Sequence, residues 1–299
     1  MEKFLIQGGI PLNGEVTPAG NKNAALPMLA ATLLSEEAII LHNVPQIRDV
    51  QDMRKLLESM GADVVDLGET SWQITAKALT PLDLDIELSR RIRASILLAG
   101  PITARCGELR LPPPGGDVIG RRRLDTHFLA LEALGAEVRY DRILEFNANG
   151  LKGANILFDE ASVTATENAV MAAVLAKGKT IIRNAASEPH VQELCHLLNS
   201  LGAKIEEIGS NTLHIEGVPS LQGGEFTIGA DYLEVISFVG AAVVTKGNIR
   251  IRNAGVKYLD MVKIVMERLG VCWEVDGDDL LVSNEQSMRI IPDYGGAIP

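Results

Sequence analysis

Basic and polar side chains recur at one equivalent place in this sequence, where a β-strand should pass into a helix of small apolar residues. Lys22, Arg93 and Thr164 each lie about 40 residues before a glycine that closes a helical pattern. The start of a helix has free backbone N–H groups and the positive end of the helix dipole, so it binds anions readily. Arg122 adds another positive charge. We therefore predict a site for a polyanionic small molecule; the alternative is a set of solvated surface side chains.

A loop that breaks the internal repeat is the second candidate. Asn43 and Asn184 end a strand in the first and third repeats, but the second repeat has Asp117 at that place, inside LPPPGGDVIGRRR (111–123). Loops carry binding and catalytic residues more often than the elements that they connect. A flexible, solvated excursion is the alternative. The common glycine-rich nucleotide motifs are absent from the sequence.

These residues are positioned by a repeat of roughly 70 residues. Helical patterns close on a glycine four times, at Gly61, Gly135, Gly202 and Gly270, and the apolar residues before each glycine form one helix face. A glycine there suits a left-handed C-terminal cap. Each unit is predicted to read strand, helix, strand, helix, strand. The units could stack as a solenoid, or close on one another with their helices buried centrally.

Composition narrows the class of protein. The chain has 299 residues, 46% hydrophobic and 22% charged, with a net charge of −11. The length suits about two domains, and the composition is typical of a folded globular chain and too apolar for a disordered one. A nucleic-acid-coating protein would need surplus Lys and Arg, so we predict no nucleic-acid partner. No apolar run reaches the length of a membrane span, and three scattered cysteines fit a reducing cytoplasm. The five histidines have no metal-ligand spacing, so no metal and no cofactor are expected.

Four segments resemble motifs of the enolpyruvyl transferases. They are AGNKNAALP (19–27), RASILLAGP (93–101), RRLDTH (122–127) after the glycine-rich loop, and SVTATEN (162–168). The resemblance covers the whole chain. It implies an inside-out α/β barrel, with helices inside and sheets outside, that is built from three repeat units in each domain.

The same resemblance implies the domain boundaries. The first domain, with three repeat units, should run over 22–229, and residues 1–21 plus 230–299 should form part of a second domain.

The resemblance implies a reaction in which the enolpyruvyl group of phosphoenolpyruvate is transferred to an acceptor hydroxyl and phosphate is released. The N-K-N-A-A start favours the branch whose acceptor is the 3-hydroxyl of UDP-N-acetylglucosamine, at the first committed step of peptidoglycan synthesis and hence of cell-wall growth and cell division. The branch acting on 3-phosphoshikimate usually carries an S-K-S start and is the alternative. A non-enzymatic protein that binds a sugar nucleotide is another.

Residue roles follow from the matched motifs. Lys22 is expected to act in catalysis and to bind phosphoenolpyruvate, and Asn23 is expected to face the sugar nucleotide. Arg93 and Arg122 should hold anionic groups. The segment Ser162, Val163 and Thr164 is assigned to the sugar nucleotide.

Asp117 is the candidate general acid. The methylene carbon of the enol must gain a proton, which requires a positioned acid. An aspartate is normally ionised at neutral pH, so the loop would have to close and exclude water for Asp117 to keep its proton. The family usually carries cysteine here, and members with aspartate are expected to resist fosfomycin, which alkylates the thiol.

Further departures from the family pattern concern length and the sugar-nucleotide contacts. Family members continue for about two more repeats, and these carry an aspartate and several arginines of the site. This chain is therefore expected to be a fragment, a truncated product or half of a split enzyme that a separate chain completes. Thr164 stands where the family tends to have glycine, and Glu160 where some members have lysine.

Overall fold

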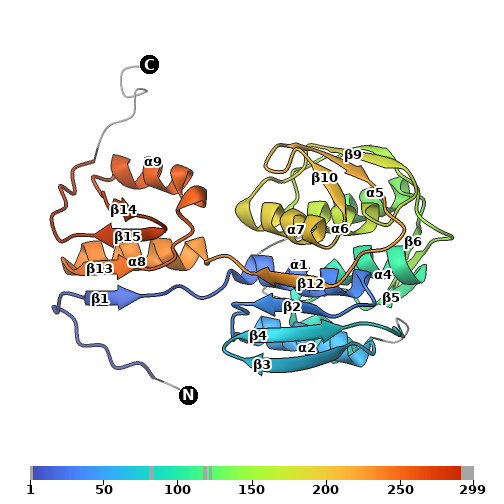
Figure 1. Ribbon diagram of the computed structural model, residues 1–299, viewed down its shortest axis with the longest axis horizontal. Coiled ribbons are helices and arrows are strands. Elements are labelled where there is room, and N and C mark those ends of the chain that lie inside the picture. The colour runs from blue at the N-terminus through green and yellow to red at the C-terminus, as the bar shows by residue number, and fades with distance from the viewer. Residues whose placement is uncertain (1–2, 81–83, 117–119, 121–122, 291–299) are drawn as a thin grey trace. The chain divides into compact units, whose positions relative to one another are not determined.

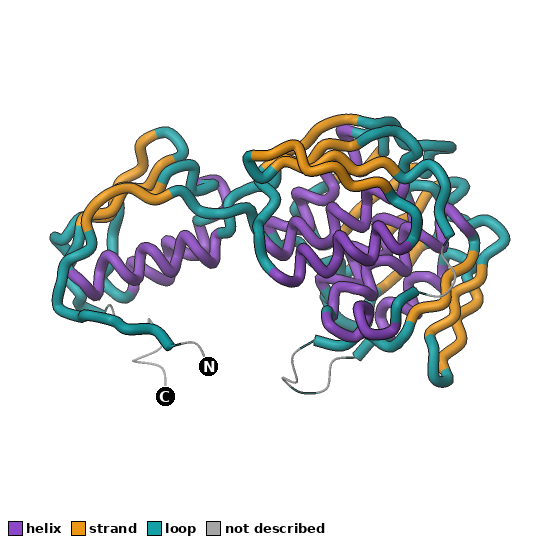
Figure 2. The backbone as a smooth tube through the Cα atoms, turned by 90° about the horizontal axis from the view of Figure 1, so that it is seen from below, coloured by secondary structure: helices purple, strands orange, loops and turns teal. Residues whose placement is uncertain are grey.

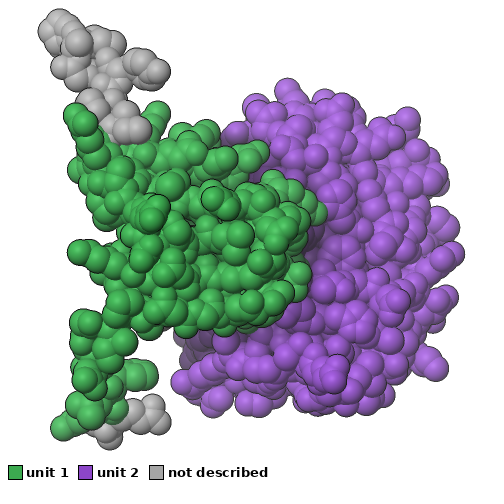
Figure 3. All heavy atoms as spheres, turned by 60° about the vertical axis from the view of Figure 1, so that its left-hand side comes forward, with its two compact units in different colours: residues 1–21, 229–299 green, residues 22–228 purple. Residues whose placement is uncertain are grey.

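The computed structural model describes residues 3–80, 84–116, 120 and 123–290. The chain divides into two compact units, coloured separately in Figure 3. Unit 1 consists of residues 1–21 and 229–299, and unit 2 of residues 22–228.

Unit 2 carries its helices inside and its sheets outside (Figures 1 and 2). Its three sheets have the strand orders β12-β2-β4-β3, β5-β7-β6 and β10-β11-β9-β8. The strands are β2 (Ile39–His42), β3 (Asp63–Gly68), β4 (Ser71–Thr75), β5 (Glu108–Leu111), β6 (Glu137–Tyr140), β7 (Leu144–Asn147), β8 (Asn155–Leu157), β9 (Lys179–Arg183), β10 (Lys204–Glu206), β11 (Thr212–Glu216) and β12 (Gly224–Thr227). The α-helices are α1 (Lys22–Ala31), α2 (Arg48–Ser59), α3 (Ile86–Arg91), α4 (Ala99–Cys106), α5 (Asp125–Ala133), α6 (Val163–Ala173) and α7 (Pro189–Ser200), with 3-10 helices η1 (Thr32–Leu34) and η2 (Arg93–Leu98). This arrangement confirms the predicted inside-out α/β fold.

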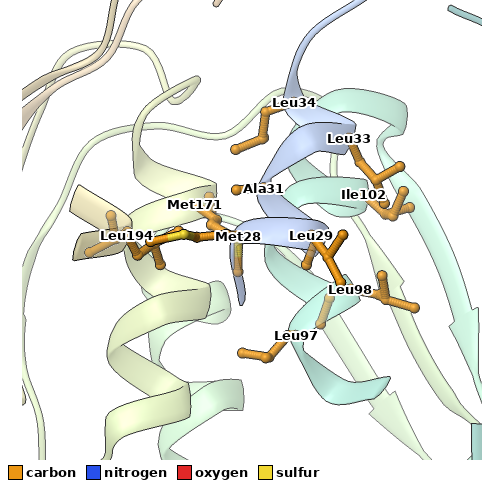
Figure 4. Close-up of a cluster of buried hydrophobic side chains, with 14 of the residues drawn as sticks. Met28, Leu29, Ala31, Leu33, Leu34, Leu97, Leu98, Ile102, Met171 and Leu194 are labelled. Carbon is orange, nitrogen blue, oxygen red and sulfur yellow. The ribbon is translucent and has the colours of Figure 1, made fainter. Parts of the chain in front are cut away.

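Helix α1 lies at the centre of unit 2 and is buried from its third residue to its end. A helix that is apolar on every side belongs in a core. Met28 packs near Met171 and Leu194, which come from α6 and α7, and Leu29 points toward Leu98 (Figure 4). The first turn of α1 is therefore held rigidly by the core beneath it.

The four repeat glycines close their helices as predicted. Gly61 has φ +95°, and the other three lie between +79° and +100°. The Gly61 N–H donates to the Glu58 carbonyl at 3.0 Å and the Ala62 N–H donates to the Leu57 carbonyl at 3.1 Å, which is the Schellman arrangement. The same pair of bonds follows α5, α7 and α9 (Asp260–Arg268).

The strand count differs from the prediction. The sequence pattern predicts one strand after each closing glycine. The structure instead has two strands there, which pair antiparallel, for example β3 and β4 after Gly61. The β3–β4 turn runs through Glu69 and Thr70, both at positive φ. A second strand satisfies backbone groups that a single strand would leave unpaired along one edge.

Unit 1 contains one four-stranded sheet in the order β1-β13-β15-β14, with α8 packed on β13 and β15. Its elements are β1 (Asn13–Val16), α8 (Tyr232–Thr245), β13 (Asn248–Ile251), η3 (Val256–Tyr258), α9, β14 (Glu274–Asp276) and β15 (Asp279–Val282). Val239, Ile251 and Leu280 lie in its buried core. Within the described residues, no helix has the length and apolar character needed to cross a bilayer.

Two strands pair with partners that are distant in sequence. β1 lies parallel to β13, with Val16 opposite Ile251, and β12 lies parallel to β2, with Phe226 opposite Leu41. The segment before α1 thus belongs to the sheet of unit 1, while the segment before α8 completes a sheet of unit 2.

Candidate active site

Lys22 is the first residue of α1 and forms an ion pair with α2. Its Nζ donates to Asp49 Oδ2 at 3.1 Å, and the two side chains are 44% and 42% exposed. Asn23 follows it in the first turn and is half-buried. An ammonium group at the start of a helix, held by a neighbouring carboxylate and open to solvent, is suited to receive an anionic ligand.

Arg93 is the first residue of η2, and both described ends of the 111–123 loop lie against it. Its Nη2 donates to the Arg123 carbonyl at 3.3 Å. On the other side, a Cβ added to Gly116 would lie 3.1 Å from Arg93 Cβ, and one added to Gly115 would collide with the Arg90 carbonyl. Only glycine permits this close approach. The predicted site residues Asp117 and Arg122 lie outside the described residues.

Thr164 is the second residue of α6, and its hydroxyl contacts a buried histidine. Thr164 Oγ1 lies 3.1 Å from His127 Nε2, on α5. His127 Nδ1 lies 2.8 Å from Asn168 Nδ2, one turn further along α6. Arg93 is close enough for its charge to lower the pKa of His127. His127 thus contacts one predicted site residue, Thr164, and lies near the charge of a second, Arg93.

His127 is neutral. It is 2% exposed, and burial, followed by the positive charge of Arg93, lowers its pKa to about 3. Burial disfavours the charged form because a protein interior solvates it poorly. His127 is therefore not an anion-binding cation at neutral pH.

The start of α6 leaves backbone donors available. Ser162 precedes the helix as its N-cap, and its side chain makes no capping hydrogen bond. Its carbonyl accepts from the Thr166 N–H at 3.0 Å and from Thr166 Oγ1 at 2.8 Å. The N–H groups of the first helical turn have no intrahelical partner, so Val163, Thr164 and the residue after them can face an anion.

Two other titratable groups between α6 and α7 are buried. Glu167 is 1% exposed, and burial, followed by the charge of Glu188, raises its pKa well above the usual range. Burial and the proximity of Glu167 raise the pKa of Cys195 to about 12. Burial therefore disfavours the charged carboxylate of Glu167 and the thiolate of Cys195. Over the described ranges, no three His, Cys, Asp or Glu side chains gather closely enough to hold a metal ion.

Sequence reasoning missed Asp49 and the role of Asn168. Asp49 lies in the first turn of α2, where an acidic residue is common because it interacts favourably with the helix dipole. Its presence in the sequence therefore does not indicate that it pairs with Lys22. In the sequence, Asn168 is only the last residue of the segment SVTATEN (162–168), and nothing there indicates its partners. His127 interrupts an apolar helix face, and in the sequence this is equally compatible with a structural role and with a ligand contact.

A family model described as EPSP synthase (3-phosphoshikimate 1-carboxyvinyltransferase) matches residues 6–293. The UDP-N-acetylglucosamine 1-carboxyvinyltransferase of Bradyrhizobium diazoefficiens is 52% identical over 297 residues, covering 99% of this chain and 69% of that protein. The protein of the same name from Treponema denticola is 51% identical, covering 100% and 70%.

Solved structures show the same fold. The enolpyruvyl transferase NikO from Streptomyces tendae superposes with a TM-score of 0.82 at 22% identity, over 93% of this chain and 67% of that one. An EPSP synthase from Acinetobacter baumannii gives 0.74 at 16% identity, over 93% and 66%. At these identities the likeness concerns the fold alone. The chain spans about 70% of the length of the curated relatives.

Proposed function

Because the chain belongs to the enolpyruvyl transferase family, we propose that it is a transferase that moves the enolpyruvyl group of phosphoenolpyruvate to the 3-hydroxyl of UDP-N-acetylglucosamine. The observation that carries this proposal is identity of about 50% over the whole chain to proteins named for that activity. The 3-phosphoshikimate reaction is less well supported, since the EPSP synthase structures are only 16% and 17% identical. The product would enter peptidoglycan synthesis in the cytoplasm.

The reaction needs fixed cations, one acid and one base. The sugar hydroxyl loses its proton to a base as its oxygen adds to C2 of phosphoenolpyruvate, and the methylene carbon gains a proton from the acid. The tetrahedral adduct then loses a proton from that carbon to a base as phosphate leaves. We assign Lys22, Arg93 and Arg122 to the phosphate and carboxylate. Asp117 would donate the proton.

The start of α6 suits the sugar nucleotide. Ser162, Val163 and Thr164 offer backbone N–H groups and one hydroxyl on one helical turn, which fits an anionic diphosphate. Asn23, next to Lys22, would face the sugar. The proton acceptor of the elimination step would come, by the resemblance, from the part of the relatives that this chain does not span. A separate chain that supplies it stays a prediction, and the comparisons offer no support for it.

Phosphate release tests the reaction. Completed by the part of the relatives that this chain does not span, the protein should release phosphate when incubated with phosphoenolpyruvate and UDP-N-acetylglucosamine, and replacement of the acceptor by shikimate 3-phosphate should abolish the release. Release only with shikimate 3-phosphate would reverse the choice between acceptors. Binding of UDP-N-acetylglucosamine without phosphate release would favour the non-enzymatic alternative for this chain.

Substitutions separate the roles. Lys22→Ala should abolish the calorimetric response to phosphoenolpyruvate with less effect on the sugar nucleotide. In an otherwise complete enzyme, Asp117→Ala should abolish most turnover, whereas Asp117→Cys should keep it and add fosfomycin sensitivity, because a thiolate attacks an epoxide and a carboxylic acid does not. Full turnover by Asp117→Ala would contradict the general-acid assignment.

A further inference from the structure

Asn168 has a hydrogen-bond pattern that fixes which atom is its oxygen. The side chain is fully buried. Its Oδ1 accepts from the Gly100 backbone N–H at 2.7 Å, and its Nδ2 donates to the Ile96 carbonyl at 2.8 Å. A backbone N–H can only donate and a carbonyl can only accept, so the amide cannot be turned over. The second N–H of the amide therefore points at the histidine ring.

This donor fixes the tautomer of His127. Asn168 Nδ2 lies 2.8 Å from His127 Nδ1, which must accept and so carries no proton. A neutral imidazole has one proton, and it must then be on Nε2. The ring is neutral because it is buried and lies near the charge of Arg93.

The Nε2 proton in turn orients the Thr164 hydroxyl. Nε2 lies 3.1 Å from Thr164 Oγ1, so the ring donates and the hydroxyl oxygen accepts. The hydroxyl proton must point elsewhere. Thr166 donates its own hydroxyl proton back to the Ser162 carbonyl, as helical threonines commonly do. No corresponding bond is made by Thr164 within the described residues, and its side chain is partly exposed.

We propose that His127 and Asn168 are positioning residues that hold the Thr164 hydroxyl as a hydrogen-bond donor to an anionic oxygen of the sugar nucleotide. This inference rests on the proposed function. Glycine at this position would offer backbone N–H groups alone. The arrangement in this chain adds one donor whose direction is set before the ligand arrives, which lowers the entropy lost on binding.

Calorimetric titration of the 299-residue chain with UDP-N-acetylglucosamine tests the donor. Thr164→Val keeps the shape and removes the hydroxyl, and it should weaken binding about tenfold or more, the range for a hydrogen bond to a charged group. Thr164→Ser should bind within about twofold of the parent. Thr212→Val, the same change on strand β11, is the control and should leave the affinity unchanged.

A double-mutant cycle tests the positioning role. His127→Leu alone should weaken binding, and the variant with both His127→Leu and Thr164→Val should bind no more weakly than Thr164→Val, because both changes remove one interaction. If the two substitutions instead weaken binding by factors that multiply in the double variant, His127 acts only on the fold and not through Thr164. Where turnover is measured, Thr164→Val should raise the KM for the sugar nucleotide and leave kcat unchanged.

The tautomer is tested without any variant. Nitrogen NMR of the parent chain should show the His127 proton on Nε2, with Nδ1 unprotonated, and a proton on Nδ1 would overturn the proposal even if His127→Leu failed to fold. A parent chain that does not bind UDP-N-acetylglucosamine would refute the proposed function, and this inference with it. Binding by the parent with an unchanged affinity in Thr164→Val would refute this inference alone.

Discussion

Replacement of His127 should remove a large part of the acid sensitivity of unit 2. The folded-state pKa of His127 is lowered to about 3 by burial and by Arg93, against about 6.5 in an unfolded chain. In that window the unfolded state binds a proton that the folded state does not, so stability is fully present above pH 6.5 and is lost as the pH falls toward 3. One pH unit corresponds to about 1.4 kcal/mol, so acidification from pH 7.5 to 4.5 should cost about 2.5–3 kcal/mol through this group alone.

Urea unfolding at several pH values measures this effect. Trp72 is fully buried in unit 2, and Trp273→Phe removes the other tryptophan, so that fluorescence reports unit 2. Other groups also titrate, so the informative quantity is the difference in unfolding free energy between the parent and His127→Gln, whose amide is neutral throughout. This difference should shift by about 2.5–3 kcal/mol in favour of His127→Gln between pH 7.5 and 4.5.

The control is Thr164→Val, which keeps the buried ring and should keep the acid sensitivity of the parent. A difference between parent and His127→Gln that does not change with pH would show that the ring is already protonated, or hydrated, in the folded state. The neutral-ring argument would then be wrong.

Further predictions concern the same unit. Glu167→Gln should raise the thermal midpoint more at pH 8 than at pH 5, because the raised folded-state pKa makes the parent lose stability as the pH rises above about 4.5. Equal gains at both pH values would contradict a raised pKa of Glu167. Gly100→Ala would place a Cβ 2.8 Å from Asn168 Oδ1 and should lower the free energy of unfolding by about 1–3 kcal/mol. Urea unfolding measures this loss, and an unaltered midpoint would contradict the close packing at Gly100. Asp49→Asn removes a half-exposed partner of Lys22 and should change the unfolding free energy by less than about 1 kcal/mol in the same assay; a larger loss would mean that this pair is more buried than the structure shows.

The repeat was readable in the sequence because its signals are local. A helix face, a closing glycine and the following strand all lie within about 20 residues, and the left-handed backbone at Gly61 and its three counterparts is a requirement that glycine meets best. The helix starts were readable for the same reason, and Lys22, Arg93 and Thr164 lie at the first or second position of α1, η2 and α6. Their roles toward substrate stay predictions, as do those of Asp117 and Arg122.

The sequence by itself thus determined the repeat, the fold class and the positions of the charged helix starts, while pairing and burial were decided only by the tertiary structure. Nothing local directs β1 to β13 or β12 to β2, because these pairs join segments far apart in the chain. In the same way, His127 has an ordinary pKa in an unfolded chain. It becomes a neutral ring with one fixed tautomer only where the core excludes water and Asn168 meets Nδ1, since desolvation and hydrogen-bond direction exist only once distant segments have packed together.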